Sequence, residues 1–258
     1  MTTAVDPRLA GFDAFRARAQ RVVGEHPVVT ANPYTPWFAT GAATRDDVRH
    51  LTVQFSVFSH LFVEAQLRKV INAADLDGYR AGKEILLNEL GVTFRDGSVD
   101  GGTFRFGAAH FEWLLKFAEP LGLGFDDLGK RRLGTPPTLF FCDELMRLYG
   151  SDDPSTAEGA SYAVEHWAAA GFWPELIAGL RAFKERERVD LPLGFWTFHD
   201  QLEAQHAAHT EDELRDAVAH TTGFDEEQFL TTAAEMLDGV LAFWAGLDAD
   251  RRHAGSAS

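Results

Sequence analysis

The stretch FHDQLEAQH, residues 198–206, brings three side chains of metal-binding type close together in the sequence. Successive residues of an α-helix are about 100° apart around its axis, which puts Glu203 roughly 40° to one side of His199 and His206 roughly 20° to the other. The three side chains therefore share one narrow face of a predicted helix. Because apolar residues precede this stretch at 194–196, the polar face either contacts water or holds a ligand.

Helical spacing extends outward from this stretch over most of the chain. Apolar residues recur every three or four positions, and the alternation typical of β-strands is scarce. Thr44, followed by Asp46 and Asp47, predicts the start of a long helix, and Gly91 predicts a left-handed C-cap at the end of another. Helices are predicted over residues 7–24, 44–73, 75–90, from 108 onward, 137–149, 154–185, 192–219 and 225–247.

The fold class that this pattern predicts is all-α, a single helical bundle of seven or eight helices. No internal repeat or domain-scale linker divides the sequence, so residues 1–250 are expected to form one domain, followed by a frayed, disordered tail at 251–258. The glycine-rich stretch 95–107 is predicted to be a connecting loop, since its glycines do not follow a predicted strand as those of a phosphate-binding loop do.

The composition indicates a globular protein with a small or neutral partner. Of 258 residues, 24 are Lys or Arg and 39 are Asp or Glu, and the formal net charge of −15 disfavours binding to nucleic acid or to anionic membranes. We see neither a signal peptide nor a run of about 18 apolar residues, so we expect a cytoplasmic protein. Cys142 is the single cysteine, which excludes an internal disulfide and a cysteine-rich metal cluster, and its apolar neighbours predict a buried, inert thiol.

Ionisable side chains also interrupt apolar helix faces elsewhere in the chain. With the 198–206 stretch they provide four carboxylates and three imidazoles: Glu64, Glu89, Glu165, Glu203, His110, His199 and His206. Any one alone would be an ordinary polar residue, but each uncompensated buried ion costs several kcal/mol, against a total stability of roughly 5–15 kcal/mol. Since no Lys or Arg is expected nearby, divalent cations would compensate the acids. Oxygen and imidazole ligands without thiolate suit iron or manganese better than structural zinc, and their number fits two ions.

In chain order, Glu89, His110 and Glu165, followed by the His-x3-Glu-x2-His element at 199–206, resemble the ligand series of the heme-oxygenase-like diiron oxidases and oxygenases. The resemblance covers about residues 45–210 and implies a heme-oxygenase-like bundle that holds two iron ions. The ligands that it implies are Glu89, His110, Glu165, His199, Glu203 and His206. Glu64, about 25 residues before Glu89, matches a further carboxylate of some members that oxygenate nitrogen. Two features differ from the family pattern: Glu203 stands where aspartate is usual, and the interval from Glu89 to His110 is longer.

The activity that this resemblance implies is that of a reductively activated enzyme with O2 as co-substrate. Its electrons would come from a reductase or a small-molecule reductant, and its substrate would be a small amine or amino acid. Glu64, as a catalytic residue and additional metal ligand, favours N-oxygenation. The alternative within this class is oxidative C–C or C–H cleavage of an amino acid or fatty acid. No organic cofactor is expected, and homodimers are common in such folds.

Other classes of helical protein need different residues. A ferritin-like diiron protein needs two Glu-x-x-His motifs, whereas Glu203 and His206 form the only one here. A thiaminase-like enzyme needs a thiol nucleophile, for which only Cys142 is present. A cofactor-free or non-catalytic small-molecule-binding member of the same fold stays open, because a fold does not determine a function.

Overall fold

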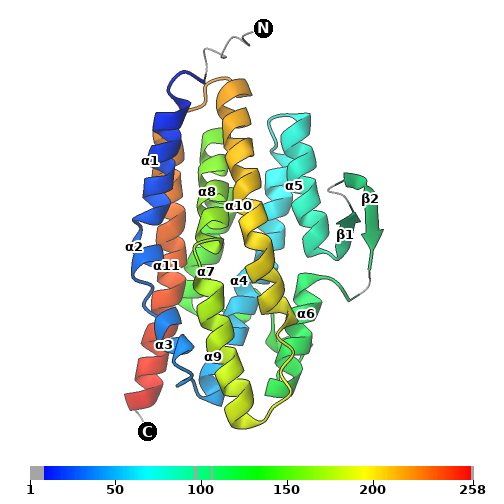
Figure 1. Cartoon of the computed structure of the whole chain (residues 1–258), viewed down its shortest axis with the longest axis vertical. Coiled ribbons are helices and arrows are strands. Elements are labelled where there is room, and N and C mark those ends of the chain that lie inside the picture. Colours follow the sequence, from blue (N-terminus) through cyan, green and yellow to red (C-terminus); the bar gives the residue numbers. More distant parts are fainter. Residues whose placement is uncertain (1–8, 96–97, 106, 257–258) are drawn as a thin grey trace.

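The structure is a computed structural model that describes residues 9–95, 98–105 and 107–256, with the side chains of 93–95, 98–102, 202–210 and 212–213 outside the description. Within these ranges the chain forms eleven α-helices and one β-hairpin (Figure 1). The elements are α1 (Phe12–Gly24), α2 (Pro27–Thr30), α3 (Thr35–Ala39), α4 (Arg45–Ile71), α5 (Leu76–Glu89), β1 (Val92–Arg95), β2 (Ser98–Phe104), α6 (His110–Ala118), α7 (Pro136–Glu144), α8 (Pro154–Ala168), α9 (Phe172–Glu187), α10 (Gly194–His220) and α11 (Glu226–Ser256). The predicted all-α bundle is confirmed.

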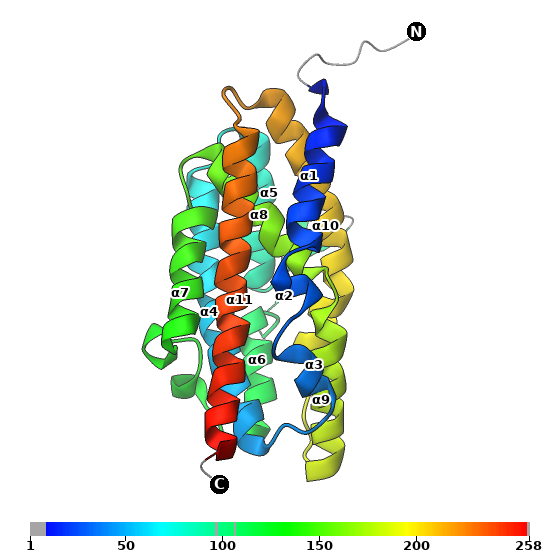
Figure 2. The same ribbon diagram turned by 90° about the vertical axis from the view of Figure 1, so that its left-hand side faces the viewer.

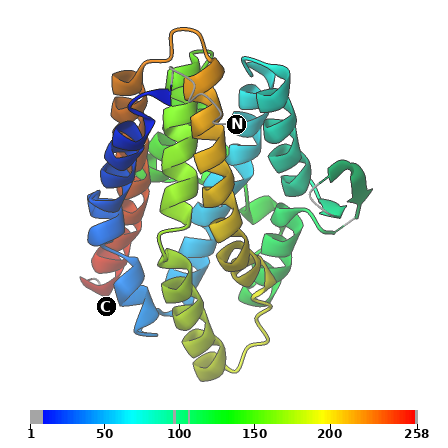
Figure 3. The ribbon, with the colours of Figure 1, turned by 45° about the horizontal axis from the view of Figure 1, so that its top comes forward.

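The long helices lie side by side along one axis (Figure 1). Helix α11 packs against α8, α7 and α1, and Figure 2 shows it in front, with α7 and α1 on either side. Helix α10 packs against α8 and α9, while α4 packs against α5, α6 and α7. The hairpin projects from the side of the bundle that α5 and α6 form (Figure 3). Six helices, α4, α5, α6, α8, α9 and α10, therefore surround one part of the interior.

Local sequence signals fix the ends of the helices that carry the site. The Thr44 hydroxyl accepts a hydrogen bond from the Asp47 N–H at 3.2 Å, and the Asp47 carboxylate accepts one from the Thr44 N–H at 2.8 Å, a reciprocal cap that begins α4. Asp75 caps α5 through the N–H of Gly78 at 2.8 Å. Gly91 follows α5 with φ +94°, the left-handed conformation that its sequence position predicted.

The predicted loop at 95–107 is in large part a β-hairpin, which is a correction. Strands β1 and β2 are antiparallel, with Val92 opposite Phe104 and Thr93 opposite Thr103. β-Branched and aromatic residues favour strands, and an Asp-Gly pair between two such runs is a hairpin signal that the sequence contains at 96–97. The hairpin accounts for the long interval between Glu89 and His110, because its two ends return to the same place.

The number of helices also differs from the predicted seven or eight. The predicted helix over 154–185 is two helices, α8 and α9, interrupted around Gly171, whose φ of +98° a residue with a side chain rarely adopts. The short helices α2 and α3 occupy the expected loop after α1. No helix among the described residues has both the length and the apolar character needed to cross a membrane.

The expected disordered tail at 251–258 is helical as far as Ser256, which is a second correction. Asp248, itself nearly buried, forms ion pairs with Arg251 and with Arg252, the latter at 2.6 Å. These i,i+3 and i,i+4 pairs lie across successive turns and stabilise the end of α11. Residues 257–258 lie outside the described residues.

Candidate metal centre

A cavity of about 90 Å³ lies within the ring of six helices. Most of its wall is aromatic or aliphatic, from residues such as Phe55, Phe58 and Val164. Four ionisable side chains interrupt this wall, and all four are predicted metal ligands: Glu89, His110, Glu165 and His199. The structure thus brings together residues from α5, α6, α8 and α10 that are far apart in sequence.

Three of these side chains form a compact group. Glu89, His110 and His199 each offer one ligand atom, and these atoms lie within 4.8 Å of one another. Ligand atoms that bind one transition-metal ion at about 2.1 Å lie about 3.0 Å apart at right angles and about 4.2 Å apart on opposite sides, so the most distant atoms must approach by at least about 0.6 Å to share one ion. The group is largely shielded from solvent, since the His110 side chain is 4% exposed and that of Glu89 15%.

The closest pair in this group has the spacing of two neighbouring metal ligands. Nδ1 of His110 lies 3.0 Å from Oε1 of Glu89, and among the described residues this buried nitrogen has no hydrogen-bond partner. Two ligand atoms about 2.1 Å from one ion and at right angles to each other are about 3.0 Å apart. The arrangement therefore fits a bound cation better than a hydrogen-bonded pair.

The hairpin and one glycine place Glu89 beside His110. Glu89 is the last residue of α5 and His110 the first of α6. The N–H of Arg105 donates to the carbonyl of Gly91 at 3.0 Å, which joins the two ends of the hairpin. A Cβ atom on Gly91 would lie 2.9 Å from the backbone nitrogen of Ala109, so only glycine permits this approach without a shift.

His199 is held in an orientation suited to a ligand. Its Nδ1 lies 2.7 Å from the carbonyl oxygen of Phe195, an atom that can only accept a hydrogen bond, so Nδ1 carries the proton and Nε2 carries the lone pair. The imidazole stacks on Trp173 with ring centres 5.2 Å apart and meets His110 edge-on at 4.8 Å. Such outer contacts fix the tautomer and the ring direction of metal-binding histidines.

Glu165 lines the same cavity from α8 and is 6% exposed. The adjacent His166 does not line the cavity; its Nδ1 donates to the carbonyl of Tyr162 at 2.9 Å, and its Nε2 lies 3.4 Å from Oε1 of Glu211. Burial lowers the pKa of His166, against smaller opposing effects of these two oxygens. The order of Glu165 and His166 along α8 thus directs the carboxylate, not the imidazole, to the site.

The two other predicted ligands of the 198–206 stretch lie on a helix, as expected. Helix α10 continues from Gly194 to His220, so His199, Glu203 and His206 have helical spacing. The side chains of Glu203 and His206 lie outside the described residues, and their role as ligands stays a prediction.

Glu64 is not in this cavity. Its side chain is 56% exposed and lies 3.6 Å from Arg68 in an i,i+4 ion pair. Phe62 lines the cavity from the same helix, and a step of two residues turns the side chain by about 200° to the opposite face. The number of residues between Glu64 and Glu89 does not determine how α4 is rotated. The match in spacing therefore does not place Glu64 in the site.

Replacing Glu64 with Gln is therefore expected to leave iron stoichiometry unchanged and to alter the free energy of unfolding by less than about 0.5 kcal/mol, as for most surface substitutions. Iron analysis of the loaded variant and urea denaturation measure both. Loss of one iron per chain would show that α4 turns Glu64 inward when metal binds.

Lys69 is a cation that the sequence was not expected to place beside α8. Its side chain is only 11% exposed, and Nζ donates a 2.7 Å hydrogen bond to the hydroxyl of Ser161, one turn before Glu165 on α8. Nζ also lies 3.7 Å from Oε1 of Glu158. Glu158 is not one of the candidate ligands; the expectation that no Lys or Arg lies near the candidate acids is wrong for Glu64, which pairs with Arg68. The apolar spacing of α4 alone could not show that Lys69 points between α4 and α8.

Cys142 is buried and does not line the cavity, as its apolar neighbours predicted. Burial raises the pKa of its thiol to about 12. Since the thiolate is the nucleophile, this environment is the opposite of the one that activates a catalytic cysteine. The thiaminase-like alternative therefore has no thiol at the cavity among the described residues.

Thiol labelling tests this assignment. At pH 8 roughly one thiol in ten thousand would be ionised at a pKa of about 12, so native Cys142 should react with a maleimide no faster than the protein unfolds. The labelling rate in buffer is compared with that in denaturant. Rapid labelling of the native protein would contradict a buried, inert thiol.

Comparisons with known proteins bear on the fold. No family model matches the chain, and no curated protein matches its sequence. A domain of unknown function with a heme oxygenase-like fold from Shewanella denitrificans superposes with a TM-score of 0.63 at 14% identity, over 99% of this chain and 97% of that one. This chain has a heme-oxygenase-like fold.

Other solved structures agree with the heme-oxygenase-like fold. A CADD-like protein of unknown function from Nostoc punctiforme matches with a TM-score of 0.66 and 17% identity, over 93% of this chain and 98% of its own. A TenA homolog from Pseudomonas syringae matches with a TM-score of 0.62 and 12% identity, over 95% and 94%. At these identities the likeness extends to the fold alone, and the function must be argued from the site.

Proposed function

We propose that this heme-oxygenase-like protein is an O2-dependent oxidoreductase whose cavity holds two iron ions. The observation that carries the proposal is the convergence of Glu89, His110 and His199 within 4.8 Å in a largely buried, apolar cavity. A divalent cation bound between these side chains would neutralise carboxylate charge and accept the lone pairs of the imidazoles. Oxygen and imidazole donors without thiolate favour iron or manganese over a structural zinc ion.

The residues that would hold the irons are those of the cavity and of the 198–206 stretch. Glu89, His110 and His199 would hold iron, Glu165 would add a carboxylate from α8, and Glu203 with His206 would complete the ligand set. Iron supplies the reduction of O2, for which protein side chains have no equivalent. The chain's own contribution is to orient the ligands, through the Phe195 carbonyl and the stack on Trp173, and to keep water away with its aromatic wall.

The substrate proposed is a small molecule that bears an amine or a carboxylate, and the electron donor a reductase or small-molecule reductant. Glu64 was the reason to prefer N-oxygenation, and its position on the outer face of α4 removes that reason. Oxidation at nitrogen and oxidative C–H or C–C cleavage are therefore equal alternatives. A cofactor-free binding protein of this fold is the rival, and it would take up no iron.

Stopped-flow mixing tests the proposal. The full chain is loaded with Fe(II) without oxygen and mixed with O2 while the visible spectrum is recorded. We expect an absorption change that requires both iron and His199. In a matched series of alkyl amines and alkyl carboxylates, one class should accelerate this change selectively. A spectrum no different from that of the loaded His199→Ala variant would contradict O2 activation at this site.

A further inference from the structure

Two tryptophans form part of the cavity wall beside the candidate ligands. Trp167 and Trp173 both line the cavity, and each is at least nine-tenths buried. The indole of Trp173 is nearly parallel to the imidazole of His199, with ring centres 5.2 Å apart and planes 23° apart. An iron bound at His199 would therefore lie next to an oxidisable ring.

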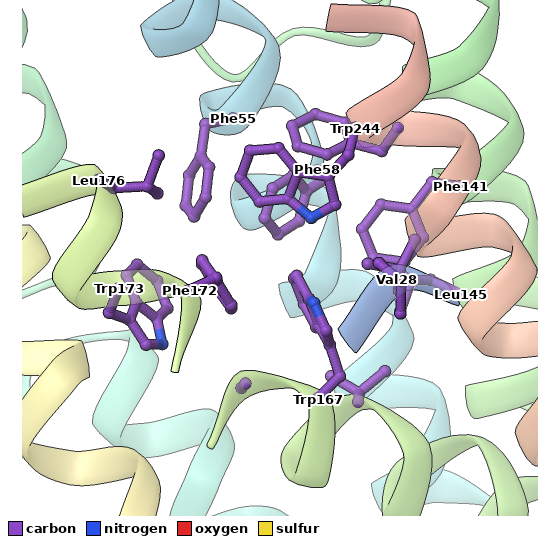
Figure 4. Packing of buried hydrophobic residues seen from close by; sticks show 14 of the residues in the cluster. Val28, Phe55, Phe58, Phe141, Leu145, Trp167, Phe172, Trp173, Leu176 and Trp244 are labelled. Atoms are coloured by element: carbon purple, nitrogen blue, oxygen red, sulfur yellow. The ribbon is translucent and has the colours of Figure 1, made fainter. Parts of the chain in front are cut away.

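Close aromatic contacts continue from these two rings through the core. Phe172 stacks on Trp167 at 4.7 Å and contacts Trp173 at 4.5 Å, and it also lies 5.5 Å from Trp244 (Figure 4). Trp244 then stacks on Tyr34, with ring centres 5.8 Å apart. The contacts bring together α8, α9, α11 and the segment before α3.

The series ends at the surface. Tyr34 meets Trp37 at 5.3 Å, and Trp37 is partly exposed. The guanidinium of Arg251, which is paired with Asp248, lies 4.1 Å from the ring centre of Trp37. A one-electron reductant in solution can therefore reach the outer ring but not the inner ones.

The buried indoles share an unusual chemical feature. The ring N–H groups of Trp167, Trp173 and Trp244 are buried and have no hydrogen-bond partner among the described residues, a feature that Trp196 shares. An unpaired buried donor destabilises the folded state, and phenylalanine would fill much of the same space without it. An indole that loses an electron here keeps its proton, because no acceptor adjoins the N–H. Electron movement along these rings would not be coupled to proton transfer.

We propose that Trp173 and Trp167, joined to Trp244 through Phe172, form with Tyr34 and Trp37 a path that carries electrons from the surface to the metal site. This path, the aromatic path, rests on the proposed function, because it requires an oxidising centre beside Trp173. In each transfer the oxidised site gains one electron and an indole loses one, with no bond formed or broken. The electron deficit moves outward to Trp37, where a soluble reductant of the ascorbate, thiol or reduced-flavin class restores the ring.

Tyr34 serves in this path as the ring between Trp244 and Trp37. Burial raises the pKa of its phenol well above the usual range, with a smaller contribution from the nearby Asp47 carboxylate. The phenol is therefore protonated at rest, and since a neutral phenol is harder to oxidise than a phenolate, the lasting electron deficit resides on the tryptophans rather than on a tyrosyl radical. Replacing Tyr34 with Phe should leave transfer between Trp244 and Trp37 intact.

A metal-free experiment tests the path independently of the proposed function. A ruthenium photo-oxidant is attached to the full chain at Thr40→Cys, an exposed position three residues from Trp37, while native Cys142 is buried. After a flash, time-resolved EPR should detect an indole radical that added ascorbate removes only slowly, because the electron deficit resides mostly on the buried rings and reacts only when it returns to Trp37. In the Trp244→Phe variant the radical should stay at Trp37, and ascorbate should remove it several-fold faster. The same lifetime in both proteins would overturn the path.

Iron-loaded protein provides the second test and its controls. The rate at which a bulky one-electron reductant reduces oxidised iron should fall several-fold in Trp37→Phe and Trp244→Phe. It should not change in Trp196→Phe, which removes a buried indole that is not on the path. Trp113 stacks on His110 at 5.6 Å and is a rival exit, so a slower rate in Trp113→Phe alone would overturn the proposal. If no iron binds at all, the proposed function fails while the flash experiment still decides the path.

Discussion

Iron binding should be lost when either His110 or His199 is replaced with alanine. Each variant removes one of the proposed ligands, so its Fe(II) affinity is expected to fall by more than the roughly 10–100-fold that loss of an outer-shell partner costs. Anaerobic titration with iron analysis measures the stoichiometry and the affinity. Because both side chains lie against aromatic rings, urea denaturation must show that each variant is folded.

The matched control for these variants is His60→Ala. His60 lies on α4, packs against Phe111, and does not line the cavity. Its side chain is exposed, but partial desolvation by its neighbours, with a smaller effect of Lys130, lowers the pKa of the imidazole. Equal iron uptake by the His110, His199 and His60 variants would contradict the placement of the metal centre.

Substitution of Gly91 with alanine should loosen the site from outside it. At φ +94° a side chain costs about 1–3 kcal/mol of strain, and the added Cβ would also lie 2.9 Å from the backbone nitrogen of Ala109. Relief of that contact moves the start of α6, and with it His110, away from Glu89. We therefore expect both a lower free energy of unfolding and weaker Fe(II) binding.

The Gly223→Ala variant distinguishes the effect of backbone strain from the effect of the steric contact at residue 91. Gly223 has φ +78°, yet a Cβ there would have no heavy atom within 4 Å. Its variant should lose stability through backbone strain alone and should bind Fe(II) as the parent protein does. If Gly91→Ala matches Gly223→Ala in both stability and affinity, the close approach of α5 and α6 does not hold the ligands together.

Sequence signals of short range predicted much of the fold. The cap at Thr44, the glycine C-cap at 91 and the helical spacing of apolar residues act within one or two turns, and the structure has the helices they predict. The same reasoning missed the hairpin, because five glycines interrupt the strand-forming residues of 91–107 and hide their alternation. It also joined α8 and α9, because one glycine within a periodic pattern does not by itself predict a break.

The site residues that could be predicted are those that lie on a helix face with apolar neighbours at helical spacing. Glu89, His110, Glu165 and His199 reach one cavity, as their order along the chain led us to expect. Glu64 does not, because an interval of residues between helices fixes neither their rotation nor their contacts. The inward direction of Lys69 and the aromatic path depend on how α4, α8, α9 and α11 pack, which no single helix encodes.

Iron-specific anomalous diffraction tests the central claim most directly. Crystals of the full chain, loaded with Fe(II) without oxygen, should show iron about 2.0–2.2 Å from a carboxylate oxygen of Glu89, a ring nitrogen of His110 and Nε2 of His199. A second iron should lie nearby, within reach of Glu165. A cavity without iron, in which His110 keeps its 3.0 Å contact with Glu89, would contradict the metal centre and leave a metal-free binding protein as the better account.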